Sequence, residues 1–279
     1  MEPGLDVQGL NRIEYFNEEL MRDFTLIQYE ELLRAAIKTG YTLTSYEDFI
    51  LRGNTYDKVF VLRHDVDDKP ENSVRTARLE ASLGAKGSYY FRVVKQSFDE
   101  TAIKTIKDLG HEIGYHYEDM ALCNGNTAKA FTHFKEKLEL FRRYYPVKTV
   151  CMHGSPLSKW DNRSLWKEHK YKDLGIIAEP YFDTDFNQVL YITDTGRMWN
   201  NATSSVRDRV TSGYQFKFAS TEAICQAFEQ GKLPARIMLN IHPQRWTDNY
   251  YFWTKELFLQ NVKNVAKRFL AKRNAQSAY

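Results

Sequence analysis

The sequence is poor in cysteine. Its 279 residues include three cysteines, Cys123, Cys151 and Cys225, and no two of them form a CxxC pair. An odd, widely spaced set of this kind argues against a disulfide framework and against a zinc site built from thiolates. A reducing, cytoplasmic setting is therefore the simplest expectation.

Several targeting and partner signals are also missing. The N-terminus, MEPGLDVQGLNRIEYF, lacks the basic segment followed by an apolar one that marks a secretory signal. No stretch approaches the roughly 18 apolar residues of a membrane span. Lys and Arg number 39 against 36 Asp and Glu, with no long basic run, so nothing suggests a nucleic-acid partner. The oligomeric state is not readable.

No internal repeat, low-complexity segment or Pro/Gly/Ser-rich linker divides the chain. Hydrophobic residues make up 43% and charged residues 27%, an ordinary globular balance. We therefore expect one domain over residues 1–279, with residues 1–55 as an N-terminal helical extension packed on it.

Extended and helical patterns alternate along the chain, which predicts an α/β fold with a mainly parallel sheet. At this length a closed barrel is favoured over an open doubly wound sheet, and no Gly-rich phosphate motif follows the first strand. The middle of the chain, from about 159 to 218, is less regular. The expected strands are 59–62, 87–94, 112–116, 149–152 and 236–241, and the expected helices are 26–40, 68–84, 100–109, 128–144, 221–230 and 254–272.

Four of the expected strands end in polar clusters that contain histidine. Barrels of this kind carry their chemistry where strands end and loops begin. One such histidine is more often a core or loop residue than a ligand, but four at successive strand ends favour a site. The clusters are HDVDD, HEIGYHYED, MHGSP and NIHPQRW.

The first cluster contains two carboxylates with the spacing of one strand face. Asp65 and Asp67 share a face because residues i and i+2 of an extended segment point the same way. Asp68 is expected to cap the next helix, with Pro70 in its first turn and Glu71 closing a capping box. Of two carboxylates on one face, one can bind a metal ion and the other can act as general base. A solvated acidic turn is the alternative.

The segments RHDVD and GHEIGYH, with a late LNIHP, resemble the polysaccharide deacetylase superfamily, carbohydrate esterase family 4, over most of the chain. The resemblance implies a distorted parallel (β/α) barrel with fewer than eight strands. It also implies that Asp65 is the general base, that Asp67 and His116 are metal ligands, and that His242 is the general acid. The cofactor it implies is a divalent metal ion, with zinc as the first candidate.

The second motif departs from the family pattern His-x-x-x-His, because Met120 stands where the second histidine belongs. His111 lies an odd number of residues before His116, so we interpret it as structural. A third metal ligand must then come from another strand end. His153 is the first candidate and Glu118 the reserve; the alternative is that His153 only hydrogen-bonds the base.

Three further residues are candidates for supporting roles. Asp194 and Trp199, in DTGRMW, resemble a family motif whose Asp and Trp support the base and line the pocket. A surface hairpin is the alternative interpretation. Arg63 borders the acidic cluster and can neutralise part of its charge.

Together these features predict a metal-dependent hydrolase that removes the acetyl group from an N-acetylated sugar. Two alternatives stay open. One is a hydrolase of another amide or C–N bond on the same fold, and the other is a catalytically silent carbohydrate-binding relative. The sugar and its linkage are not readable from the sequence.

Overall fold

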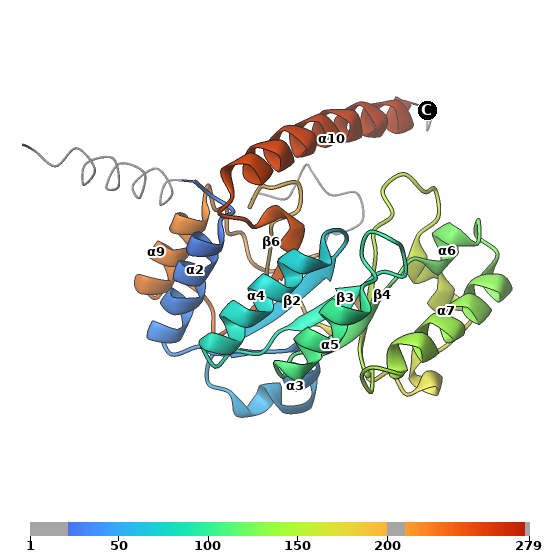
Figure 1. Cartoon of the computed structure of the whole chain (residues 1–279), viewed down its shortest axis with the longest axis horizontal. Coiled ribbons are helices and arrows are strands. Elements are labelled where there is room, and N and C mark those ends of the chain that lie inside the picture. The colour runs from blue at the N-terminus through green and yellow to red at the C-terminus, as the bar shows by residue number, and fades with distance from the viewer. Residues whose placement is uncertain (1–21, 200–209, 277–279) are drawn as a thin grey trace, which may run out of the picture.

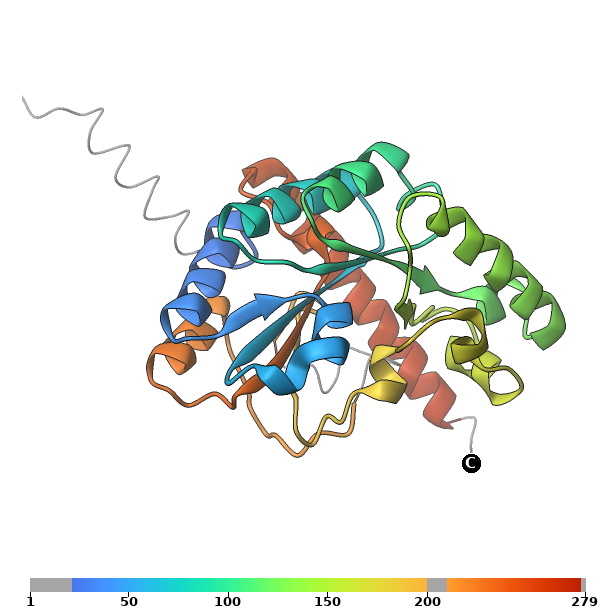
Figure 2. The ribbon, with the colours of Figure 1, turned by 90° about the horizontal axis from the view of Figure 1, so that it is seen from below.

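The computed structural model describes residues 22–199 and 210–276, with side chains described as far as residue 265. Its centre is a seven-stranded sheet in the order β5-β4-β3-β2-β7-β6, with β1 beside the first half of β2 (Figures 1 and 2). Every pairing is parallel. The strands are β1 (Thr42–Thr44), β2 (Val59–Val66), β3 (Ser88–Phe91), β4 (Glu112–Tyr117), β5 (Val150–Met152), β6 (Leu190–Thr193) and β7 (Arg236–Ile241).

The expected fold class, a distorted parallel barrel with fewer than eight strands, is confirmed. The described strands form a half-barrel, with β5 and β6 at the two ends of the hydrogen-bonded order. Helices pack around it, and in the described residues no helix is both long and apolar enough to cross a bilayer. The helices are α2 (Leu26–Lys38), α3 (Tyr46–Arg52), α4 (Pro70–Ser82), α5 (Glu100–Asp108), α6 (Asp119–Leu122), α7 (Thr127–Arg142), α8 (Pro180–Asp183), α9 (Thr221–Glu229) and α10 (Tyr250–Gln276).

Some boundaries differ from those expected. The strand expected at 59–62 continues to Val66, so the acidic cluster begins inside a buried strand and not in a surface loop. The segment 1–55, expected to be a helical extension, holds α2 and α3 in its described part but also provides strand β1. Residues 1–21 lie outside the described part, and the division into domains stays a prediction.

The expectation that Asp68 caps α4 is wrong. The residue before the helix is Lys69, at φ 51°, and no side chain caps the first turn, so Glu71 closes no capping box. Asp68 instead accepts a hydrogen bond from the Lys69 backbone at 2.9 Å. Because the chain enters α4 through this left-handed residue, the Asp68 carboxylate lies outside the first turn.

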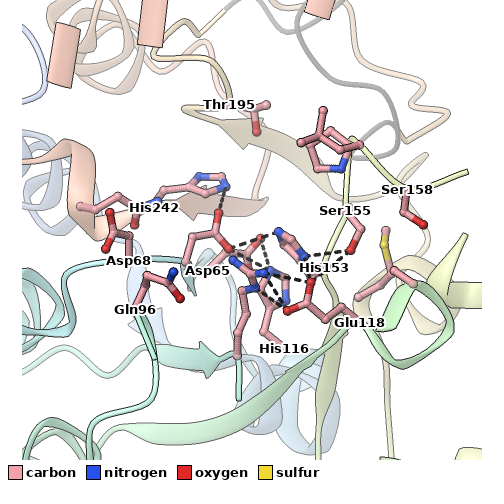
Figure 3. Close-up of a pocket in the computed structure, with 18 of the residues that line it drawn as sticks. Asp65, Asp68, Gln96, His116, Glu118, His153, Ser155, Ser158, Thr195 and His242 are labelled. Atoms are coloured by element: carbon pink, nitrogen blue, oxygen red, sulfur yellow. Dashed lines mark hydrogen bonds and ion pairs between the residues drawn. The ribbon is translucent and has the colours of Figure 1, made fainter. Parts of the chain in front are cut away.

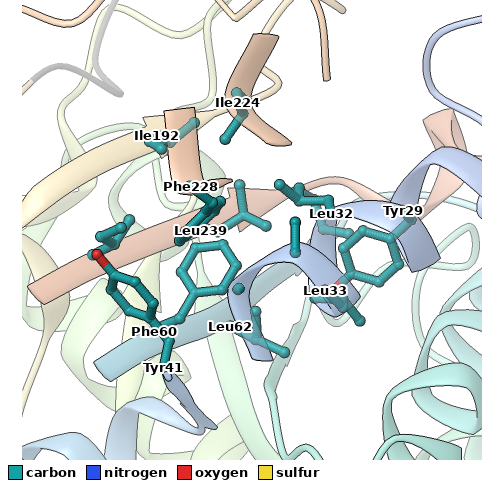
Figure 4. Packing of buried hydrophobic residues seen from close by; sticks show 14 of the residues in the cluster. Tyr29, Leu32, Leu33, Tyr41, Phe60, Leu62, Ile192, Ile224, Phe228 and Leu239 are labelled. Carbon is teal, nitrogen blue, oxygen red and sulfur yellow. The ribbon is translucent and has the colours of Figure 1, made fainter. Parts of the chain in front are cut away.

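The two faces of β2 have different neighbours. Phe60 and Leu62 point outward and pack against α2 and α9 in the cluster shown in Figure 4. Val59 and Val61 point inward and pack with Met238 of β7. This alternation follows from the two-residue period of a strand, and it makes the next inward positions Arg63 and Asp65.

A cluster of buried polar side chains connects strands β2 and β3 to helices α2 and α4. Glu80 of α4 accepts hydrogen bonds from Tyr29 at 2.6 Å and Tyr89 at 3.0 Å, and its carboxylate lies 2.7 Å from Nε2 of His64. His64 also contacts the Ser88 carbonyl through Nδ1. Burial would raise the pKa of Glu80, but the charge and hydrogen bond of His64 outweigh it and lower that pKa.

Because Glu80 is fully buried with ionisable partners, removing its charge should destabilise the fold. We expect Glu80→Gln to lower the free energy of unfolding by about 3–5 kcal/mol, the usual cost of breaking a buried ion pair. Glu30→Gln is the control, since Glu30 pairs with Arg34 on the exposed surface of α2 and should cost under about 1 kcal/mol. Urea unfolding measures both, and equal losses would contradict the role given to Glu80.

Candidate active site

Inward-facing positions at the carboxyl ends of the strands meet in one cleft of about 820 Å³. Figure 3 shows several of these side chains converging there. The pairs at the carboxyl ends of β2 and β4 are each two residues apart, as the alternation requires. From β2, β4, β5 and β7 and the residues that follow them come Asp65 and Asp67, His116 and Glu118, His153, and His242.

Asp67, His116 and His153 form a group that could hold a metal ion. Their ligand atoms lie within 4.8 Å of one another. Oδ1 of Asp67 is 3.7 Å from Nε2 of His116 and 3.6 Å from Nε2 of His153. These distances exceed a hydrogen bond, but they allow the atoms to share one ion at about 2 Å from each.

The protonation pattern of this group fits a cation. Nδ1 of His116 contacts the Cys151 carbonyl at 3.0 Å and must donate to it, because a carbonyl only accepts. Burial lowers the pKa of His116 to about 4, so at neutral pH the ring is neutral and Nε2 holds a bare lone pair. That lone pair faces Oδ1 of Asp67, which is buried and accepts no hydrogen bond from the described residues. A cation between the two would satisfy both.

Glu118 positions His153. Its Oε2 lies 2.9 Å from Nδ1 of His153, and its two oxygens accept hydrogen bonds from Arg92 at 2.8 and 2.9 Å. Burial would raise the pKa of Glu118, but His153 and Arg92 lower it to about 2. Nε2 of His153 is thereby directed at Asp67. Histidine ligands of metals commonly have such a carboxylate partner on the other ring nitrogen.

Asp65 is held from two sides at the end of β2. Arg63 donates to both of its oxygens, at 3.1 and 2.8 Å, and the Asn240 amide donates at 3.0 Å. Burial alone would raise the pKa of Asp65, but Arg63, His116 and His242 outweigh it and hold the pKa well below its ordinary value. The alternative in which His153 hydrogen-bonds Asp65 differs from the structure, where Arg63 and Asn240 donate to that carboxylate and Glu118 contacts His153.

His242 is fixed by Asp194. Oδ1 of Asp194 lies 2.6 Å from Nδ1 of His242, and the same carboxylate accepts hydrogen bonds from Arg245 and Trp246. Nε2 of His242 faces the cleft, 3.9 Å from Oδ2 of Asp67. The sequence motif implied that Asp194 supports the expected base, Asp65. In the structure the Asp194 carboxylate contacts His242 instead.

Three other residues named from the sequence lie away from the cleft. Trp199 is buried and stacks on Phe24 at 5.5 Å, so it does not line the pocket. His111 accepts from the Gly87 backbone and contacts the Ala77 carbonyl, which is the structural role expected for it. Met120 is buried in the core beneath α7, so a histidine there would lie among apolar side chains.

A second group of ligand-type atoms, Asp65, His116 and Cys151, overlaps the first. Asp65 already accepts four hydrogen bonds, two from Arg63, one from Asn240 and one from the Cys151 thiol. Oδ1 of Asp67 accepts none from the part of the chain that the structure describes. The group of Asp67, His116 and His153 is therefore the better cation site.

Sequence reasoning missed several residues that hold the site together. Asn240, Arg245 and Trp246 stand in the motif NIHPQRW, and Asn240 is two residues before His242 and so on its strand face. Arg92 is two residues after the inward-facing Tyr90. The two-residue period was the available signal for Asn240 and Arg92.

No protein-family profile and no curated protein sequence matches the chain. Among solved structures, it is similar to a CE4 esterase from Streptococcus mutans, with 14% identity, a TM-score of 0.42 and coverage of 84% of this chain and 90% of that one. It is also similar to peptidoglycan deacetylase PdaC from Bacillus subtilis, with 9% identity, a TM-score of 0.35 and coverage of 76% and 97%.

A third similar structure is the Xyl-CE4 domain of a multidomain xylanase from the hindgut metagenome of Trinervitermes trinervoides. Its identity is 12%, its TM-score 0.37, and the match covers 78% of this chain and 84% of that one. At these scores the likenesses carry no argument about the chemistry of this chain.

The geometry predicts how metal binding responds to substitution. We expect Asp67→Asn and His153→Ala each to abolish tight zinc binding, and Glu118→Gln to weaken it by about 10–100-fold through loss of the ring's partner. His169→Ala is the control, because His169 stacks on Phe131 outside the cleft. Titration calorimetry on the metal-free protein measures the affinities. Unchanged affinity in His153→Ala would remove His153 from the ligand set.

Proposed function

We propose that this chain is a metal-dependent hydrolase of the polysaccharide deacetylase type, which removes the acetyl group from an N-acetylated sugar. The observation that carries the proposal is Oδ1 of Asp67, which accepts no hydrogen bond from residues 22–199 and 210–276 and faces Nε2 of His116 and of His153. Two groups able to move protons lie close by: Oδ2 of Asp65 is 3.8 Å from Nε2 of His116, and Nε2 of His242 is 3.9 Å from Oδ2 of Asp67.

One carboxylate and two imidazoles suit zinc, and Asp67, His116 and His153 would hold it. Such an ion supplies Lewis acidity, which polarises an amide carbonyl and lowers the pKa of a water molecule. The remaining groups of the cleft then serve the two proton transfers that amide hydrolysis requires.

Asp65 accepts the proton of the attacking water in this proposal. Arg63 and Asn240 fix its carboxylate, and the low pKa keeps it ionised. The same pairing with Arg63 makes Asp65 a weak base. It can therefore take a proton only from a water whose own pKa has been lowered.

His242 donates a proton to the leaving nitrogen as the C–N bond breaks, and the products are acetate and the free amine. Its Nδ1 is engaged by Asp194, which leaves Nε2 as the atom that faces the cleft. Asp194 is fully buried and is itself neutralised by Arg245. This arrangement holds the ring in one orientation, with Nε2 toward the cleft.

The deciding experiment supplies zinc to the protein and measures acetate released from N-acetylated mono- and oligosaccharides, with Asp67→Asn as the inactive control. Release of acetate supports the proposal. If the protein hydrolyses other amides but releases no acetate from these sugars, it is a hydrolase of a different C–N bond. Zinc binding without any hydrolysis would assign it to a silent carbohydrate-binding protein.

Asp65→Asn should separate catalysis from metal binding. We expect its zinc affinity to stay close to that of the parent, because Asp65 is not among the three proposed ligands. Turnover should fall by about a hundredfold or more, the usual scale for a lost general base. Steady-state kinetics and calorimetry on the same preparation test this, and an equal loss of zinc in Asp65→Asn and Asp67→Asn would refute the division of roles.

His242→Ala should discriminate between leaving groups. An amine must be protonated as it leaves, whereas an activated phenol needs little help. The variant should therefore lose about a hundredfold or more on acetamide substrates and much less on an activated acetate ester. Asp194→Asn should shift activity in the same direction through the orientation of the ring. Equal losses on both substrate types would indicate a ligand or a structural residue.

A further inference from the structure

Helix α10 has its polar and apolar faces reversed. Glu256, Gln260 and Asn264, each four residues from the next, are buried. Glu256 and Gln260 line the cleft. The opposite side of the helix is exposed and carries apolar side chains, with Phe258 69% and Val262 53% accessible, beside polar ones such as Lys255. A surface helix normally buries its apolar stripe, so this exposed face needs a separate explanation.

The orientation of α10 is fixed by specific contacts. The Asn264 amide donates to the Gly196 carbonyl at 2.9 Å, and Arg197 donates to the Trp253 carbonyl at 3.0 Å. At the other side of the cleft Lys69 lies 3.6 Å from the Glu256 carboxylate. The helix therefore cannot turn its apolar face inward without breaking these bonds.

Exposed apolar side chains are concentrated on this helix. Of the 13 large hydrophobic side chains exposed in the described part of the chain, seven belong to α10. The seven are Tyr250, Tyr251, Phe252, Phe258, Leu259, Val262 and Val265. Figure 1 shows α10, in red, lying along the outside of the molecule.

The helix is also the basic part of an otherwise slightly acidic chain. Residues 250–276 contain six Lys and Arg and one Glu, a charge of +5. Of the two basic residues whose side chains are described, Lys263 lines the cleft, and Lys255 is exposed one turn from Phe258 and Leu259. The whole chain carries +3, so the rest carries −2. A partner of α10 should therefore combine negative charge with an apolar surface.

We propose that the outward face of α10 docks on an anionic membrane surface, with the helix lying in the plane of the interface. Aromatic and aliphatic side chains on a basic helix bind there through buried apolar area and attraction to anionic headgroups. A second copy of the chain fits less well, because a two-fold interface would place this basic helix against itself. Since the inner face of α10 lines the cleft, docking brings the cleft to the membrane.

The test is co-sedimentation of the full chain with phosphatidylcholine vesicles, with and without phosphatidylglycerol. We expect binding only with the anionic lipid, weakened by added salt. Phe258→Ser and Val262→Ser should each lower the affinity by roughly tenfold through lost apolar burial. Leu51→Ser on α3 is the matched control, because Leu51 is 59% exposed outside α10 and should change nothing.

Metal binding and docking are independent, so Asp67→Asn should still sediment with the vesicles whatever the fate of the proposed activity. Absence of binding to anionic vesicles would overturn the proposal, as would equal binding by Phe258→Ser. Analytical ultracentrifugation measures the oligomeric state of the parent chain and of Phe258→Ser. A dimer that Phe258→Ser dissociates, without vesicle binding, would assign the face to a second copy instead.

Discussion

Side chains along a strand point alternately to two faces, and this two-residue period places both the core and the cleft. On β2 the outward positions Phe60 and Leu62 build the core against the helices. The inward positions at the carboxyl end of β2 are Arg63 and Asp65, which lie at the cleft. The same period sets His116 on β4. Because both faces of the half-barrel are buried, the packing that stabilises the sheet also fixes the register of the cleft.

Burial of several carboxylates around one cleft is costly unless each has a partner. Asp65 is paired with Arg63, Glu118 with Arg92, and Asp194 with Arg245. Asp67 differs, since one of its oxygens is buried and accepts no hydrogen bond from the described residues. The pairing of charges in the cleft and the positions of the ligand atoms therefore both indicate Asp67 as the carboxylate that would bind a cation.

The fold and the inward-facing positions could be predicted because they follow from local period and strand ends. His153 lies beside Asp67 and His116 because β5 pairs with β4, which the alternation of elements already indicated. Contacts between distant segments could not be predicted in this way. The partner of Asp194 is His242, 48 residues away. The position of Trp199 in the core and the left-handed entry to α4 at Lys69 likewise depend on tertiary packing.

The inside of the half-barrel below the cleft is filled. Val59, Val61 and Met238 are fully buried there, and Tyr90 and Thr149 hydrogen-bond to each other between β3 and β5. A molecule that enters the cleft at the carboxyl ends of the strands therefore meets a packed floor and not a channel. Reactant and products would therefore cross the same rim of the half-barrel, at the carboxyl ends of the strands.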